Sequence, residues 1–161
     1  MTQEDKSITR KNLPDGFYQI VILGATVHDN KSGKGVHLRI AYDIVAPKEF
    51  RLHFDSEYKA QKSEDKKYHG FMYICVPFNG DQYSNTDIAR KYKEFIHALE
   101  VSNPTYQYEE ASDKRFDLMR GLRLFVYIEN ETTVCTNNQN YKQPKIKRFY
   151  EPFKLNEGRW N

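Results

Sequence analysis

The feature that most constrains the fold is a strict alternation of side chains in the run Arg120–Glu129. Every second position holds an aliphatic residue: Leu122, Leu124, Val126 and Ile128. Arg123, Phe125 and Tyr127 stand between them. A period of two is typical of a β-strand with one buried face, so the aliphatic set is predicted to face a core. The cation and the two rings then face outward.

The stretch Lys142–Phe153 is predicted to return as a second strand. Together with Lys154 it carries five cationic residues against one acidic residue, so its local charge is strongly positive. The segment between the strands, Glu131–Tyr141, contains Asn137–Asn140, a composition that favours a turn. Two interpretations remain open: the rings and cations meet a ligand, or a solvated hairpin packs its rings on a neighbouring strand.

Earlier runs also have strand character. Phe17–Val27 is apolar at both parities, Val36–Ile44 alternates cleanly, and Phe71–Phe78 is a short apolar run. A further alternation begins at Phe50–Phe54, where Arg51 is predicted to point outward. These runs supply the strands that would precede the last two.

A single amphipathic helix is predicted after the N-cap candidates Ser84–Asp87. Apolar residues recur at helical spacing from Ile88 to Leu99, and the helix is expected to end before Pro104. One helix before the last two strands matches a mainly β fold, the five-stranded Greek-key barrel of the OB-fold. The run Phe71–Phe78 then either continues strand three after an inserted hairpin or adds an edge strand.

In an OB-fold, the groove for oligonucleotides lies on strands two and three, between the loop after strand one and the loop joining the last two strands. The outward residues fall in that region, and loops Asp29–Gly35 and Asn137–Lys142 would form its rims. Rings stack on bases and cations neutralise phosphates without reading a sequence. The predicted nucleic-acid-binding residues are Arg39, Arg51, Arg123, Phe125, Tyr127, Lys142, Lys145, Lys147 and Phe149. His37 and His53 are weaker candidates because an exposed histidine is mostly neutral at pH 7.

Length and composition favour one domain. The 161 residues suit a single barrel, which we place at residues 15–154, with a flexible arm at 1–14 and a C-terminal tail at 155–161. The net charge of +3 favours a local basic patch and argues against an acidic mimic of DNA. No apolar run approaches the roughly 18 residues that span a bilayer, and no signal peptide is evident, so a cytoplasmic location is expected.

No constellation of reactive groups predicts an enzyme. The loop Lys31–Gly35 lacks the pattern of a phosphate-binding P-loop. Cys75 could pair with His69 or His97, but nothing in the sequence positions a third group beside them. We therefore expect no catalytic residue.

The sequence gives equally little evidence for a metal site. Asp43, Asp55 and Glu57 could be imagined as the metal ligands of a nuclease, although polar strand positions explain them equally well. Cys75 and Cys135 have neither the spacing of a zinc site nor the number needed for a disulfide framework, so both are expected to be reduced thiols. We expect no metal and no cofactor.

Several short motifs occur in a particular order along the chain. They are Leu13–Tyr18, Lys31–Gly33 before a regular strand, a Lys-rich helix, Leu118–Leu122 and Ile146–Tyr150. This order resembles phage-encoded single-stranded DNA-binding proteins of the OB-fold type, over about Leu13 to Phe153. The resemblance implies a protein that coats and protects single-stranded DNA, with little sequence preference, during phage replication or recombination in the host cytoplasm. Phage or host replication and recombination proteins would be further partners, and the oligomeric state is left open, a homo-oligomer included.

One departure and one alternative accompany this resemblance. Many cellular single-strand binders end in an acidic tail that recruits partners, whereas Lys154–Asn161 is not acidic. The alternative function is a phage protein-interaction module that acts on a host factor, because sheet edges and aromatic hairpins also suit protein contacts.

Overall fold

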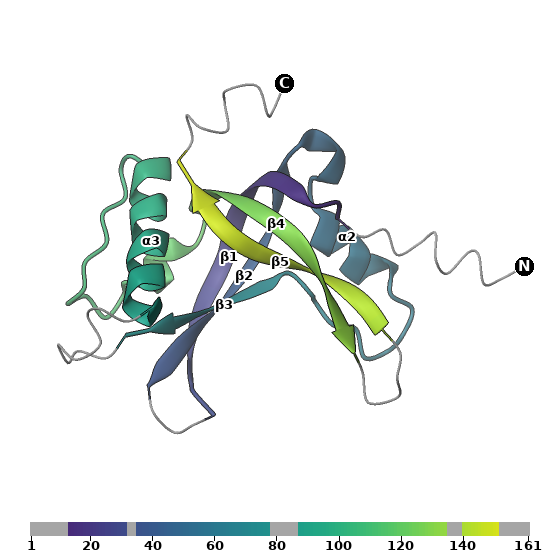
Figure 1. Cartoon of the computed structure of the whole chain (residues 1–161), viewed down its shortest axis with the longest axis horizontal. Coiled ribbons are helices and arrows are strands. Elements are labelled where there is room, and N and C mark those ends of the chain that lie inside the picture. Colours follow the sequence, from purple (N-terminus) through teal and green to yellow (C-terminus); the bar gives the residue numbers. More distant parts are fainter. Residues whose placement is uncertain (1–12, 32–34, 78–86, 135–139, 152–161) are drawn as a thin grey trace, which may run out of the picture.

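The fold is a five-stranded antiparallel sheet that curls into a nearly closed barrel, compatible with an OB-fold (Figure 1). The computed structural model describes residues 13–31, 35–77, 87–134 and 140–151. The strands lie in the order β3-β2-β1-β4-β5, and each neighbouring pair is antiparallel. Their bounds are β1 Gly16–Asp29, β2 Val36–Ala46, β3 Phe71–Val76, β4 Arg123–Val134 and β5 Asn140–Tyr150. The prediction of a mainly β barrel with a helix before the last two strands is confirmed.

The core lies inside the barrel and under helix α3, Asp87–Ser102. Strands β2 and β4 bury the alternating aliphatic residues that the sequence assigned to the interior, Leu38, Ile40, Ile44, Leu124, Val126 and Ile128. Helix α3 adds Tyr92, Phe95 and Leu99 to the same cluster. Burial of one face therefore fixes the strand orientations over most of the sheet.

Strand β1 has apolar residues at both odd and even positions, because the set of positions that faces the core changes along the strand. The pairing with β2 is irregular between Ile22 and Gly24, so the residues that face the core change parity there. Ile20 and Ile22 point inward before the irregularity, and Ala25 lies opposite the buried Ile40 after it. A β-bulge of this kind lets one strand contact a curved core from either parity.

The predicted strand at Phe50–Phe54 is wrong, because this segment is helical. A 3-10 turn, η1 Lys48–Phe50, leads into helix α2, His53–Ala60. The buried Asp43 carboxylate accepts hydrogen bonds from the backbone N–H groups of Phe54 at 2.9 Å and Asp55 at 3.0 Å, so it caps the first turn of α2 from a neighbouring strand. The insertion before the third strand is therefore helical rather than a hairpin, and the run that begins at Phe71 is strand three itself.

The folded part begins slightly before the boundary expected from the sequence. Leu13 is fully buried, and its carbonyl accepts a hydrogen bond from the Asn130 side-chain amide at 2.6 Å. The Tyr18 hydroxyl donates to the Pro14 carbonyl at 2.6 Å. Leu13 and Pro14 thus belong to the barrel and not to the arm. Among the residues described here, no helix combines the length and the apolar character needed to cross a membrane.

Candidate nucleic-acid interface

A cluster of aromatic rings covers the outer face of β1, β4 and β5. The strand registers place Phe17 beside Tyr127 and place Phe125 beside Tyr150. The Phe17 ring lies 5.1 Å from both the Tyr127 and the Tyr150 ring, edge to face in each case. We call these four half-buried rings, together with the exposed Arg148, the aromatic face. The Arg148 guanidinium carbon lies 5.9 Å from the Tyr127 ring centre.

A bulge in β5 decides which residues reach this face. Tyr127 lies opposite Arg148, but the next pair is Ile128 with Ile146, so Lys147 is the extra residue. Phe149 therefore turns inward, and its ring packs against Phe95 of α3 with 5.4 Å between centres. The prediction that Phe149 points outward is wrong for this reason, and Arg148 and Tyr150 take the outward positions instead.

The basic residues of the last two strands are partly balanced by acids. Lys145 is exposed and lies opposite Glu129, and Lys147 forms an ion pair with Glu131. Lys142 is exposed further along β5. Local charge near the end of the β4–β5 hairpin is consequently mixed, which differs from the strongly positive strand that the β5 sequence alone indicates.

Arg123 sits at the start of β4 with its side chain exposed. The Asn103 side chain fixes the backbone there, because it accepts from the Arg123 N–H at 3.0 Å and donates to the Arg123 carbonyl at 2.8 Å. Arg123 lies opposite Val21 on the outward side of the sheet, two positions before Phe125 on the same strand. It therefore extends the aromatic face by one cation.

A second group of outward residues lies on β2 and β3. Tyr73 is 58% exposed and pairs with Arg39 across the strands, while the His37 ring lies 5.9 Å from the Tyr73 ring. The Arg39 guanidinium carbon stands 3.8 Å above the Phe71 ring centre. We call His37, Arg39, Phe71 and Tyr73 the β2–β3 patch. This cation–π contact stabilises the position of the Arg39 side chain beside Phe71.

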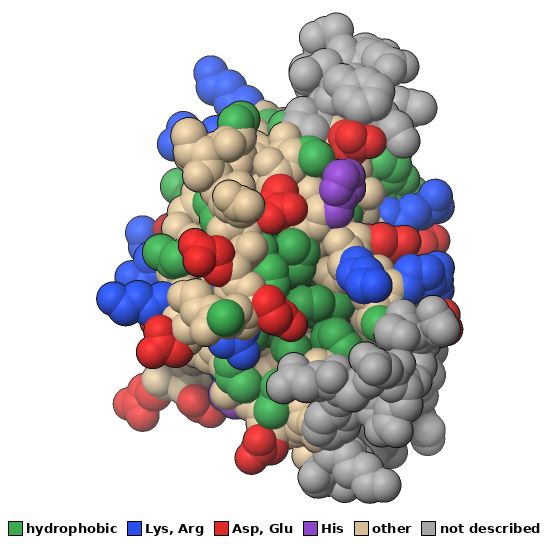
Figure 2. Space-filling view, turned by 90° about the vertical axis from the view of Figure 1, so that its left-hand side faces the viewer, with side chains coloured by type: hydrophobic (Ala, Val, Ile, Leu, Met, Phe, Trp, Pro, Cys, Tyr) green, Lys and Arg blue, Asp and Glu red, His purple; other side chains and the backbone are tan. Residues whose placement is uncertain are grey.

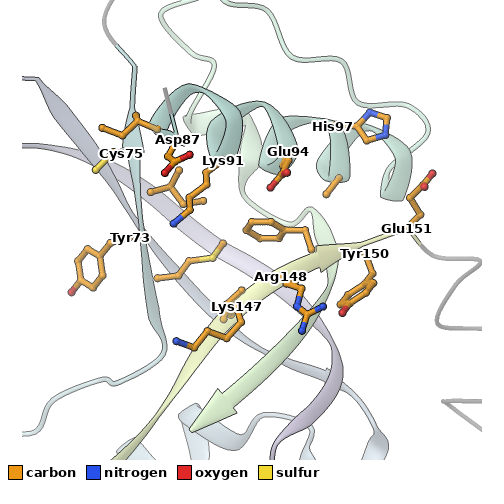
Figure 3. Close-up of a pocket in the computed structure, with 16 residues that line it drawn as sticks. Tyr73, Cys75, Asp87, Lys91, Glu94, His97, Lys147, Arg148, Tyr150 and Glu151 are labelled. Carbon is orange, nitrogen blue, oxygen red and sulfur yellow. The ribbon is translucent and has the colours of Figure 1, made fainter. Parts of the chain in front are cut away.

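The two groups meet at a seam where the barrel is open. Strands β3 and β5 are the edges of the sheet, and a cavity of about 640 Å³ lies between them beside α3. Figure 3 shows Tyr73 of β3 on one side of this opening and Lys147, Arg148 and Tyr150 of β5 on the other. The aromatic face and the β2–β3 patch therefore border the same groove, which we call the seam.

The connection that follows α3 has a different surface. The connection between α3 and β4 carries four exposed acids, Glu109, Glu110, Asp113 and Asp117. Figure 2 views the molecule from this side and shows acidic and basic side chains around a hydrophobic centre. Lys114 and Arg120 are also exposed on this connection, so its surface carries charges of both signs.

Two candidate residues from the sequence analysis, Arg51 and His53, do not lie on the sheet. Arg51 is exposed between η1 and α2, away from both outward groups, because the segment around it is not a strand. His53 is half-buried at the start of α2, and burial lowers its pKa, which favours the neutral ring at pH 7. Neither prediction of an outward strand position at these residues was correct.

The structure also brings in residues that the sequence reasoning missed: Phe17, Tyr73, Arg148 and Tyr150. A signal for Tyr73 was present, since Phe71, Tyr73 and Cys75 alternate with the inward Met72 and Ile74. The outward positions of Arg148 and Tyr150 depend on the β5 bulge, and the sequence contains no pattern that predicts this bulge.

The described residues contain no group of three or more His, Cys, Asp or Glu side chains that could hold a metal. The Asp43 carboxylate, one of the three acids named above as conceivable nuclease ligands, accepts hydrogen bonds from backbone N–H groups, including that of Ile44 at 2.8 Å. Cys75 is an exposed free thiol. Cys135 and parts of both predicted rim loops lie outside the described residues.

No known protein-family model matches this chain. A search of curated proteins likewise found no significant match.

Proposed function

We propose that this protein binds single-stranded DNA, largely without sequence preference, across the aromatic face, the seam and the β2–β3 patch. One observation carries the proposal: rings and a guanidinium group share the outward side of β1, β4 and β5, and Tyr73, Arg148 and Tyr150 continue this surface to the two borders of one open groove. A flexible strand offers ring faces and phosphates at every nucleotide, and this surface offers partners for both.

Stacking would supply most of the affinity. Each base stacked on an aromatic side chain is worth about 1–3 kcal/mol. Phe125 and Tyr127 are half-buried side chains on the outward side of β4, and Tyr73 is more exposed than either. Bases placed on either side of the seam would thus find a ring on each border.

Cations would supply the remainder by neutralising phosphates. The candidates are Arg39 on β2, Arg123 on β4, and Lys142, Lys145 and Arg148 on β5. Each phosphate contact on a single strand contributes a log–log salt slope of about −0.7. Acids opposite the β5 lysines lower the local potential, so we expect two to four effective contacts and a total slope between about −1.4 and −2.8.

The resemblance of the sequence motifs to phage single-stranded DNA-binding proteins favours a role in phage replication or recombination. Coating would protect transient single strands in the host cytoplasm, and replication or recombination proteins would act on the coated strand. No catalytic step is part of this proposal.

The test is a titration of fluorescein-labelled oligo-dT, followed by anisotropy at two salt concentrations, with oligo-U in parallel. Binding in the nanomolar to micromolar range that weakens with salt supports the proposal. Absence of binding to either oligonucleotide at low salt would reject it and would favour the protein-interaction module.

A further inference from the structure

Two histidines lie side by side near the end of the β1–β2 hairpin, next to the β2–β3 patch (Figure 1). His28 of β1 is directly opposite His37 of β2, and their rings are stacked with 5.8 Å between the centres and 23° between the planes. His28 is exposed and His37 is half-buried. His28 therefore extends the patch from β2 onto β1.

Both rings have a hydrogen-bond acceptor for one N–H group. His37 Nδ1 lies 2.9 Å from Asn30 Oδ1, an oxygen that can only accept, so this nitrogen carries a hydrogen. His28 Nε2 lies 2.9 Å from the Thr26 hydroxyl oxygen, whose own hydrogen can reach the Arg39 carbonyl at 3.5 Å, so Nε2 is assigned as the donor. A further proton would enter at the other nitrogen of each ring, and neither hydrogen bond would be broken.

The surroundings of the pair hold little negative charge. Among the described residues, neither histidine forms an ion pair. The titratable and charged groups around the pair on the three strands and in the hairpin connection are Asp29, Lys31, Arg39, Tyr73 and Cys75, while Lys34 lies outside the described residues. Asp29 follows His28 directly and so lies on the opposite face of β1, because side chains of a strand alternate between faces. The described residues of β1, β2 and β3 therefore place no carboxylate on the face that the pair occupies.

We infer that His28 and His37 form an acid-dependent phosphate-binding element, an inference that rests on the DNA-binding function proposed above. Histidine is the side chain that ordinarily changes from neutral to cationic as the pH falls from about 8 to about 5. The pair would then add one or two cations to a surface whose other cations, Arg39 among them, are charged throughout this range. Two charged rings at this separation repel each other, so the first proton enters more easily than the second, and a phosphate beside the rings favours both.

The test is oligo-dT binding to the full chain, measured by anisotropy at about pH 8 and about pH 5.5 over a series of salt concentrations. A rhodamine label is used because its emission is insensitive to pH in this range, and thymine gains no proton there. At the acid pH we expect at least about threefold tighter binding in about 0.1 M salt, and a log–log salt slope steeper by about 0.7 to 1.4, for one or two added phosphate contacts. Equal affinities and equal slopes at the two pH values would overturn the inference.

Variants assign the acid response to particular rings. His28→Gln with His37→Gln keeps polar side chains that cannot gain charge, so the ratio of the two affinities should fall to about one. This ratio cancels any effect of the substitutions that is the same at both pH values. His69 is also exposed but lies beside Glu57 at 3.0 Å, away from the patch, so His69→Gln is the matched control and should keep the full ratio. A full ratio in the double variant, or its loss in His97→Gln on α3, would overturn the assignment to the pair.

The same titrations separate this inference from the function on which it rests. Binding that is equally tight at both pH values would reject only the role of the histidine pair. Absence of binding at both pH values would reject the DNA-binding function and the inference with it. Circular dichroism at each pH verifies that the parent and the variants remain folded.

Discussion

Replacement of two outward rings tests the stacking surface directly. Phe125→Ala with Tyr127→Ala removes two rings of the aromatic face from β4 and leaves the inward residues Leu124 and Val126 untouched. The barrel should fold, because the buried face of β4 is unchanged. One structural loss is the edge-to-face contact of Tyr127 with Phe17, worth about 0.5–1.5 kcal/mol.

The expected loss of affinity follows from the geometry. If each ring stacks one base at the low end of about 1–3 kcal/mol, the pair contributes about 2 kcal/mol. A free energy of about 1.4 kcal/mol is a factor of ten in affinity, so the dissociation constant for oligo-dT should rise roughly thirtyfold, and at least about tenfold. The salt slope should stay the same, since no cation is removed.

The assay is fluorescence anisotropy with oligo-dT, run well below the melting temperature of the double variant. Tyr58→Ala with Leu118→Ala is the control, because both side chains are partly exposed and neither lies on the aromatic face or lines the seam cavity. Circular dichroism verifies that both proteins are folded. A folded Phe125→Ala, Tyr127→Ala protein that binds as tightly as the parent would refute the stacking argument.

Three further predictions concern charge, packing and capping. Lys145→Ala with Arg148→Ala should reduce the log–log salt slope of oligo-dT binding by about 0.7 to 1.4, since Glu129 lies opposite Lys145, and an unchanged slope would remove both from the phosphate contacts. In thermal melts, Gly70→Ala should destabilise by about 1–3 kcal/mol, because the added Cβ would lie 2.5 Å from a carbonyl oxygen, whereas Gly24→Ala, with no neighbour within 4 Å, should change stability by less than about 1 kcal/mol. Asp43→Ala leaves three backbone N–H groups without their acceptor and should cost at least about 3 kcal/mol in urea unfolding, while Asp43→Asn, which keeps one acceptor oxygen, should cost less.

The sequence predicted the barrel because burial imposes a regular period on most strands. The alternation in β2 and β4 matches their buried faces, and the predicted helix matches α3. The sequence also placed Phe125 and Tyr127 outward correctly, since no irregularity interrupts β4 between Arg123 and Tyr127. The inward or outward direction of a side chain can be predicted from the sequence wherever strand pairing is regular.

The sequence predictions were wrong in two situations. In one, an extra residue in a strand reverses which side chains face the core, and in the other, a group distant in the sequence determines the local secondary structure. One extra residue in β5 turns Phe149 inward and Tyr150 outward, and nothing in the local composition marks Lys147 as that residue. Helix α2 depends on the Asp43 carboxylate, which is eleven positions from Phe54 and reaches it only in the folded barrel. Period-two spacing of Leu52 and Phe54 was therefore ambiguous between a strand and a capped helix.

The distribution of charge determines how the proposed DNA surface would work. A basic groove would bind mainly through counterion release and would lose most of its affinity as salt rises. Here Lys145 lies opposite Glu129 and Lys147 is paired with Glu131, so the cations of β5 are largely offset where they are most dense. Stacking of bases on the rings is not offset by these acids. Binding should therefore persist at salt concentrations that dissociate purely electrostatic complexes, and the loss from removing the rings should be similar at low and high salt.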